Sequence, residues 1–155
     1  MGIFDMMNIS ASALSAERQR AEVISANMAN AETTHTDSGG PYVRKEVIFG
    51  ATSGPLFHNV MSGLGRFSQA PAGSVQLAQV IDDPTPPVMH YEPGNPDADA
   101  KGFVAYPAIN PVKEMADLMG SVRSYQLNAS AVGAEKQMVQ ESIGILKTSY
   151  YGVAR

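Results

Sequence analysis

The feature that most constrains this chain is the placement of its prolines. All ten lie between Pro41 and Pro111 in a sequence of 155 residues. Proline breaks the interior of a helix, so both ends of the chain are free to form long helices and the middle is not. The sequence therefore predicts three parts: an N-terminal helical part over residues 1–38, a middle domain over 39–109 and a C-terminal helical part over 110–155.

The N-terminal helix is expected over residues 7–31. Apolar side chains recur there every seven residues, at Met7, Leu14, Ala21 and Met28, with Ile24 on the same face. This is a weak heptad pattern, because polar residues occupy other matching positions. Either Asp5 or Asn8 is suited to cap the start, and a polar run over residues 32–40 ends the helix.

The C-terminal helix has a stronger pattern. Asn110 is a good N-cap, and Pro111 follows at the first helical position, where proline is favoured. A stripe with alternating spacings of three and four residues then runs through Met115, Leu118, Val122, Tyr125, Ala129, Val132, Lys136, Val139, Ile143, Leu146 and Tyr150. Only Lys136 interrupts it, so the pattern predicts a coiled coil.

The middle part contains short strand-like segments. They lie at residues 42–49, 74–81, 88–91 and 103–106, separated by turns rich in glycine and proline. Residues 50–73 show no clear pattern and are expected to form a loop. The predicted fold class is α+β, mainly α, with two long terminal helices and a small middle domain rich in strands and loops.

The predicted helices carry few charges. Between residues 1 and 31 only Asp5, Glu17, Arg18, Arg20 and Glu22 are charged, whereas a helix facing water usually carries more. We interpret these faces as contacts with other chains, which leaves the ends poorly ordered before assembly. The alternative is that both helices are amphipathic and fold back on their own domain.

The sequence contains no complete motif for a metal site, a cofactor site or a catalytic site. There is no cysteine, and the three histidines are scattered, so neither a metal site nor a cofactor is expected. Residues 97–102 resemble part of a calcium loop, but Lys101 replaces a ligand and Ala108 replaces the bidentate glutamate, so an ordinary acidic turn is expected. No nucleophile or phosphate-loop motif is present, so no catalytic residue is predicted.

The charge pattern limits the classes of partner. The net charge is −4 and no basic cluster occurs, so nucleic acid is not expected as a partner. The sequence offers no set of convergent titratable groups for a polar pocket, so no small-molecule substrate is expected. No apolar run reaches 18 residues, and the first residues lack a Sec-type signal, which alone favours a cytoplasmic protein without membrane insertion.

Both ends of the chain resemble the flagellar rod and hook axial proteins. The N-terminal segment that carries the resemblance runs over residues 10–34 and contains Ser25, Asn27 and Asn30. The C-terminal segment contains Tyr106, Asn110 and residues 124–128. The middle, residues 83–107, resembles the proximal-rod type of this family. These segments cover about two-thirds of the chain.

The resemblance implies a structural function. The terminal helices would form an inner coiled-coil (D0-like) domain, and the chain would assemble helically with copies of itself and other rod proteins into a hollow periplasmic shaft that transmits torque. Export by the flagellar type III apparatus, at the base of the basal body, would replace a signal peptide. The alternatives are another rod or hook subunit, a secretion chaperone or adaptor, and a small enzyme with a helical stalk.

The predicted assembly interface follows both helices. Its residues are Met7, Leu14, Ala21, Ile24, Asn27, Met28, Asn30, Met115, Leu118, Val122, Tyr125, Asn128, Val132, Val139, Ile143 and Leu146. Asn27 and Asn30 are expected to close the first helix and to bond neighbouring backbone. Arg18, Arg20, Arg123 and Glu114 are candidates for ion pairs between subunits.

Overall fold

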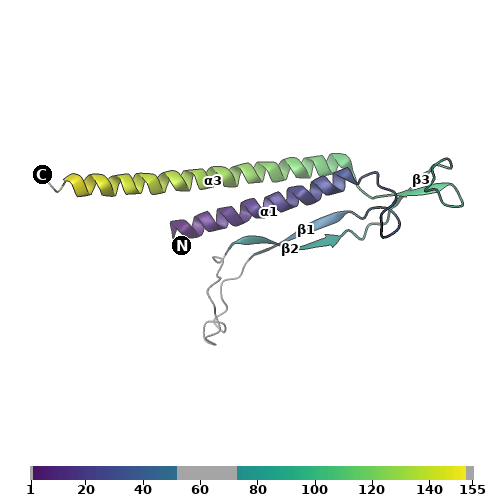
Figure 1. Ribbon diagram of the computed structural model, residues 1–155, viewed down its shortest axis with the longest axis horizontal. Coiled ribbons are helices and arrows are strands. Elements are labelled where there is room, and N and C mark those ends of the chain that lie inside the picture. Colours follow the sequence, from purple (N-terminus) through teal and green to yellow (C-terminus); the bar gives the residue numbers. More distant parts are fainter. Residues whose placement is uncertain (1, 52–72, 153–155) are drawn as a thin grey trace, which may run out of the picture. The chain divides into compact units, whose positions relative to one another are not determined.

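The computed structural model describes residues 2–51 and 73–152. In chain order the elements are α1 (Ile3–Ala29), β1 (Lys45–Ala51), β2 (Val75–Asp82), β3 (Val88–Tyr91), β4 (Phe103–Tyr106) and α3 (Pro111–Gly152) (Figure 1). All four predicted strand segments are confirmed, with boundaries shifted by three residues or fewer. The loop predicted at residues 50–73 lies almost wholly outside the described residues.

Helix α1 begins at Ile3, four residues before the predicted start. The Asp5 carboxylate accepts a hydrogen bond from the backbone nitrogen of Gly2 at 2.7 Å, and the Gly2 carbonyl accepts one from the backbone nitrogen of Asp5. Asp5 therefore lies in the first turn and bonds back toward the start, as the acidic residue of a capping box does. Neither Asp5 nor Asn8 precedes the helix, so the predicted cap positions were wrong.

The end of α1 is closed by Asn30. Its side-chain amide donates to the Ala26 carbonyl at 2.8 Å, and its Oδ1 accepts from the Thr33 hydroxyl at 3.2 Å. The Ala26 carbonyl also accepts a hydrogen bond from the Asn30 backbone nitrogen at 3.1 Å, so the side chain adds a second bond to this carbonyl at the last turn of the helix. The predicted role of Asn30 in closing the first helix is confirmed.

Helix α3 begins where the sequence predicts. The Asn110 Oδ1 accepts hydrogen bonds from the backbone nitrogens of Val112 at 3.0 Å and Lys113 at 3.3 Å. Pro111 stands at the first helical position, where its missing N–H costs nothing.

The strands form two separate pairs, β1 with β2 and β3 with β4. The β3–β4 pair is antiparallel, with Val88 opposite Tyr106 and Tyr91 opposite Phe103. The Tyr91 and Phe103 rings contact edge to face at 5.3 Å between centroids. Such cross-strand aromatic pairs stabilise a short hairpin.

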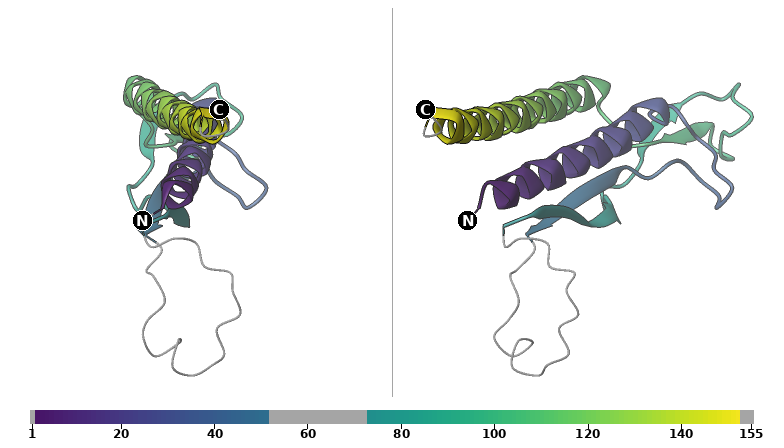
Figure 2. Two further views of the ribbon diagram at one scale, coloured as in Figure 1. Left: turned by 90° about the vertical axis from the view of Figure 1, so that its left-hand side faces the viewer. Right: turned by 60° about the vertical axis from the view of Figure 1, so that its left-hand side comes forward.

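The chain divides into two compact units. One comprises Met1–Ala16, Ala51–Gln76 and Ser124–Arg155, and the other Glu17–Gly50 and Leu77–Arg123. In each unit a part of α1 lies beside a part of α3 (Figures 1 and 2). In the second unit the two helices are antiparallel, since Glu17 bonds Ser121 and Asn27 bonds Glu114. The fold is mainly α with two small strand pairs, while the coiled-coil geometry and the three-part domain division stay predictions.

The apolar core of each unit is small. Among the described residues the buried apolar side chains are Ala16 in the first unit and Ile24, Val104 and Pro107 in the second. Buried polar residues are as prominent, and Glu114 and Asn27 are among the largest fully buried side chains. Polar contacts between buried side chains therefore contribute much of the packing between the elements.

Candidate assembly interface

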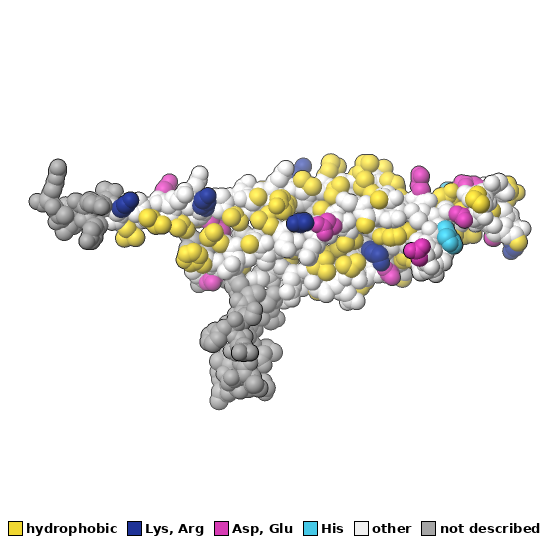
Figure 3. Space-filling view, viewed as in Figure 1, with side chains coloured by type: hydrophobic (Ala, Val, Ile, Leu, Met, Phe, Trp, Pro, Cys, Tyr) yellow, Lys and Arg dark blue, Asp and Glu magenta, His cyan; other side chains and the backbone are white. Residues whose placement is uncertain are grey.

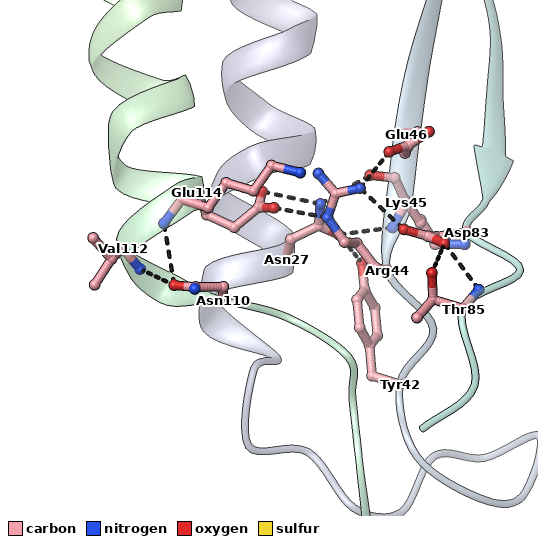
Figure 4. Close-up of polar contacts among 11 residues, drawn as sticks. Asn27, Tyr42, Arg44, Lys45, Glu46, Asp83, Thr85, Asn110, Val112 and Glu114 are labelled. Carbon is pink, nitrogen blue, oxygen red and sulfur yellow. Dashed lines mark hydrogen bonds and ion pairs between the residues drawn. The ribbon is translucent and has the colours of Figure 1, made fainter. Parts of the chain in front are cut away.

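Asn27 is the centre of a polar cluster between α1, α3 and β1 (Figure 4). Its side-chain nitrogen donates to the Lys45 carbonyl at 2.9 Å and to Glu114 Oε2 at 3.4 Å. Its Oδ1 accepts from the Lys45 backbone nitrogen at 2.9 Å and from the Tyr42 hydroxyl at 3.2 Å. All four hydrogen-bonding positions of this buried amide are used. The predicted bond from Asn27 to neighbouring backbone is confirmed.

Glu114 is fully buried and pairs with Arg44. The Arg44 Nε lies 2.7 Å from Glu114 Oε1, and the other guanidinium contacts join Arg44 to Asp83 at 3.2 Å and to Glu46. A buried carboxylate is tolerated only when it is paired and hydrogen-bonded, and Glu114 is both. The sequence suggested Glu114 for pairing between subunits, but its partners belong to its own chain.

The surroundings of Arg44 and Asp83 favour the charged form of both side chains. Burial lowers the pKa of Arg44. Hydrogen bonds with Glu114, Glu46 and Asp83 raise the pKa by more than burial lowers it, so the pKa lies above its ordinary value. The pKa of Asp83 is lowered chiefly by hydrogen bonds from the Thr85 hydroxyl and amide, and then by Arg44. Because Arg44 stays positive at any physiological pH, Glu114 keeps its counter-charge.

A polar column runs along α3 at intervals of seven residues. Glu114, Ser121, Asn128 and Glu135 are buried or partly buried at this spacing. The Ser121 hydroxyl lies 2.8 Å from the Glu17 carbonyl of α1. In the other unit, Ser10 of α1 donates to Glu135 Oε1 at 3.4 Å. In each unit this column therefore contacts α1.

The predicted apolar stripe of α3 splits into two columns. In one, Leu118, Val132 and Val139 are partly buried. In the other, Met115, Val122 and Ile143 are exposed. The side chains of α3 that contact α1 by hydrogen bonds thus come from the neighbouring polar column. Most described members of the predicted stripe are exposed, Tyr125 and Leu146 of the first column included.

The sixteen predicted interface residues fall into three groups. The buried ones are Ile24 and Asn27. The partly buried ones are Met7, Leu14, Ala21, Met28, Asn30, Leu118, Asn128, Val132 and Val139. The exposed ones are Met115, Val122, Tyr125, Ile143 and Leu146.

The first turns of α3 carry a continuous apolar surface. Val112, Met115, Met119 and Val122 recur at spacings of three and four residues and are 76%, 51%, 66% and 46% exposed. Figure 3 shows hydrophobic side chains gathered over this part of α3, at the upper edge of the view. Heptad spacing places these four side chains on one face, so together they form an apolar strip.

Nearly the whole chain is similar to known flagellar proteins. It is 36% identical to the flagellar basal-body rod protein FlgC of Bacillus subtilis, over 95% of this chain and the full length of that protein. It is 33% identical to FlgC of Borreliella burgdorferi, over 95% of this chain and 99% of the relative. FlgC of Escherichia coli O6:H1 is 36% identical over 92% of this chain and 97% of its own length.

The chain belongs to the FlgC family of flagellar basal-body rod proteins. Two family models agree: "Flagella basal body rod protein" matches residues 7–34, and "Flagellar basal body rod FlgEFG protein C-terminal" matches residues 100–145. The first match contains Asn27 and Asn30, and the second contains Asn110 and Glu114. The resemblance inferred from the sequence is confirmed for the family.

The acidic segment after β3 folds as a turn in this FlgC-family chain. The Asp99 Oδ1 accepts from the backbone nitrogens of Lys101 at 2.8 Å and Phe103 at 2.9 Å. Asp97 accepts from the Thr34 hydroxyl at 2.6 Å. These carboxylates hold the loop, as expected of an acidic turn. Within residues 2–51 and 73–152, no three histidine or acidic side chains gather closely enough to bind a metal ion.

Sequence reasoning missed Arg44, Ser121 and Glu135. The seven-residue spacing of Glu114, Ser121, Asn128 and Glu135 was a visible signal, but only Glu114 and Asn128 were singled out, and both for contacts between subunits. Arg44 gave no local signal, because its partners Glu114 and Asp83 lie far away in sequence.

Along the described part of the chain, the helices lack the combination of length and apolarity required for crossing a bilayer.

Proposed function

We propose that this FlgC-family rod protein is a subunit of the proximal flagellar rod. Copies of it would assemble helically with other rod proteins into a hollow periplasmic shaft that transmits torque, without catalysis. Family membership supports the rod function. The resemblance of residues 83–107 to the proximal-rod type supports the finer position.

One observation carries the assembly proposal. The strip formed by Val112, Met115, Met119 and Val122 is exposed, whereas Glu114 and Ser121 of the same helix are buried within the chain. An apolar strip of heptad spacing is stabilised by packing against another helix, and burial contributes about 25 cal/mol per Å² of apolar surface. We infer that a helix of an adjoining subunit covers it.

The inner coiled-coil domain belongs to the same proposal. Exposed members of the predicted interface in the other unit, Tyr125, Ile143 and Leu146, would join the contact between subunits. The partly buried members, such as Leu118 and Val132, would pack mainly within the chain. Export through the flagellar type III apparatus and assembly from the base of the basal body complete the proposal.

The experiment replaces one exposed residue of the strip. Met119→Asp is expected to abolish swimming and to remove the protein from purified basal bodies, while the free chain folds normally because Met119 is 66% exposed. Met119→Leu is the matched control, since it keeps an apolar side chain of similar volume, and it should retain both properties.

Two results would contradict the proposal. If Met119→Asp still supports normal swimming, the strip is not an assembly contact. If the unaltered protein does not copurify with intact basal bodies, it acts elsewhere, for example as an export chaperone or adaptor.

A further inference from the structure

A recess of about 540 Å³ lies beside the β3–β4 pair. It is lined by residues that follow α1, by both strands, by the segment that leads into α3 and by the first residue of α3. Its apolar lining includes the buried Pro107 and the partly buried Ile109, while Val88 is exposed. All lining residues belong to the same compact unit, so the recess does not depend on the other unit.

The recess is acidic and contains no lysine or arginine. Its two carboxylates belong to Glu32 and Glu92. Glu92 Oε2 accepts hydrogen bonds from Asn95 and from the Tyr106 hydroxyl, both at 3.1 Å, and both donors are neutral. Glu32 is exposed, and within the described residues it makes no hydrogen bond or ion pair.

The acids around β1 and the start of α3 have cations of their own. Glu114, Glu46 and Asp83 share Arg44, and Asp82 pairs with Lys45 at 2.9 Å. The recess therefore differs from the Arg44 cluster in having negative charge without a counter-charge. The pKa of Tyr106 reflects this, because the hydrogen bond to Glu92, followed by burial and by the charges of Glu92, Glu32 and Asp97, raises it.

The chemistry of the residues that line the recess matches a guanidinium group. The His90 and Tyr106 rings meet edge to face at 5.1 Å between centroids and both line the recess. Arginine stacks on aromatic rings, buries its aliphatic stem against apolar surface and forms paired hydrogen bonds with carboxylates. A lysine ammonium is more strongly hydrated and stacks less well, so arginine is the better fit.

We propose that this recess receives an arginine side chain from an adjoining protein subunit. The inference rests on the proposed function, because it requires a neighbour in the rod. It adds a second contact, of opposite character to the apolar strip on α3: one surface is covered by apolar packing, and the other is neutralised by a cation.

Photocrosslinking in cells that build flagella tests the proposal. A benzophenone amino acid is placed at Val88, which is 48% exposed at the recess, and at Met119 as a reference probe on the strip. Mass spectrometry then identifies the crosslinked peptides. We expect the Val88 probe to capture a segment of another subunit that has an arginine within a few residues of the crosslink.

A charge variant supplies a second measurement. Glu32→Gln with Glu92→Gln removes both charges, while each glutamine still offers an oxygen to accept hydrogen bonds. We expect the Val88 crosslink to fall by about fivefold, which corresponds to an ion pair of about 1 kcal/mol. Asp37→Asn, at an exposed turn position, is the control and should leave the yield unchanged.

The outcomes separate this inference from the proposed function. If Met119 crosslinks to a rod protein but Val88 does not, or if Val88 captures a segment without arginine, the arginine contact is wrong and the rod function stands. An unchanged yield in the charge variant likewise overturns the arginine contact. If neither probe crosslinks and the protein is absent from basal bodies, the proposed function itself fails.

Discussion

At the residue scale, Asn27 shows how one side chain joins three elements. Its amide pairs with both backbone groups of Lys45, as a neighbouring strand would, and also contacts Tyr42 and Glu114. No other residue type of this size offers two donors and two acceptors in one plane. The asparagine in the N-terminal motif therefore has a physical explanation within the single chain.

Asn27→Ala is expected to lower the free energy of unfolding by about 2–4 kcal/mol, because it leaves the buried Glu114 and the Lys45 backbone short of partners. Urea unfolding followed by circular dichroism measures the change. Asn8→Ala is the control, since Asn8 is exposed on the same helix and its loss should cost less than about 0.5 kcal/mol. Equal losses for both variants would contradict the role assigned to Asn27.

At the element scale, the turn between β3 and β4 depends on one glycine. Gly102 has φ +84°, and an added Cβ would lie 3.0 Å from Tyr91 Cε2 and 3.2 Å from Pro93 Cβ. Its backbone nitrogen also donates to the Asp99 carbonyl at 2.9 Å. Both the left-handed conformation and the close contacts disfavour a side chain at this position.

Gly102→Ala is therefore expected to destabilise the protein by about 1–3 kcal/mol through backbone strain and crowding. The shift in the urea midpoint gives the value. Gly94→Ala is the matched control in the same loop, because an added Cβ there meets nothing within 4 Å. If Gly102→Ala proved as stable as Gly94→Ala, the turn would not require this conformation.

At the scale of the whole molecule, the two units differ in what stabilises them. The unit containing Pro111 at the start of α3 has the Arg44 cluster together with Ile24 and Val104 as buried apolar residues. In the other unit the described buried apolar residue is Ala16, and the buried Glu135 has one carboxylate oxygen without a hydrogen bond. Few buried apolar groups and an unsatisfied buried oxygen both reduce local stability.

Hydrogen exchange on the free chain at low concentration tests this difference. Amides of α3 after Ser124 are expected to exchange about tenfold or more faster than those between Glu114 and Arg123, since each 1.4 kcal/mol of local stability corresponds to a factor of ten. Incorporation into the rod should slow exchange in both parts. Strong and uniform protection along α3 in the free chain would show instead that both ends are stable without partners.

The sequence by itself determined where the elements lie. Local signals predicted these positions, and the structure agrees with them. They are the prolines between residues 41 and 111, the Asn110 cap, the closing Asn30 and the alternating pattern of the strands. The start of α1 was misplaced because the first turn is held by Asp5 bonding back to Gly2. An aspartate was expected just before the helix, whereas Asp5 lies within its first turn and Gly2 precedes the helix.

Only the tertiary structure decided which column of α3 contacts α1. The sequence contains an apolar column through Met115 and Val122 and a polar column through Glu114 and Ser121, side by side at the same spacing. Burial of the polar column depends on partners remote in sequence, Arg44 and Glu17 among them, and no local pattern reveals these. With Glu114 and Ser121 of its polar column bonded inside the chain, the helix leaves Met115 and Val122 of its apolar column exposed.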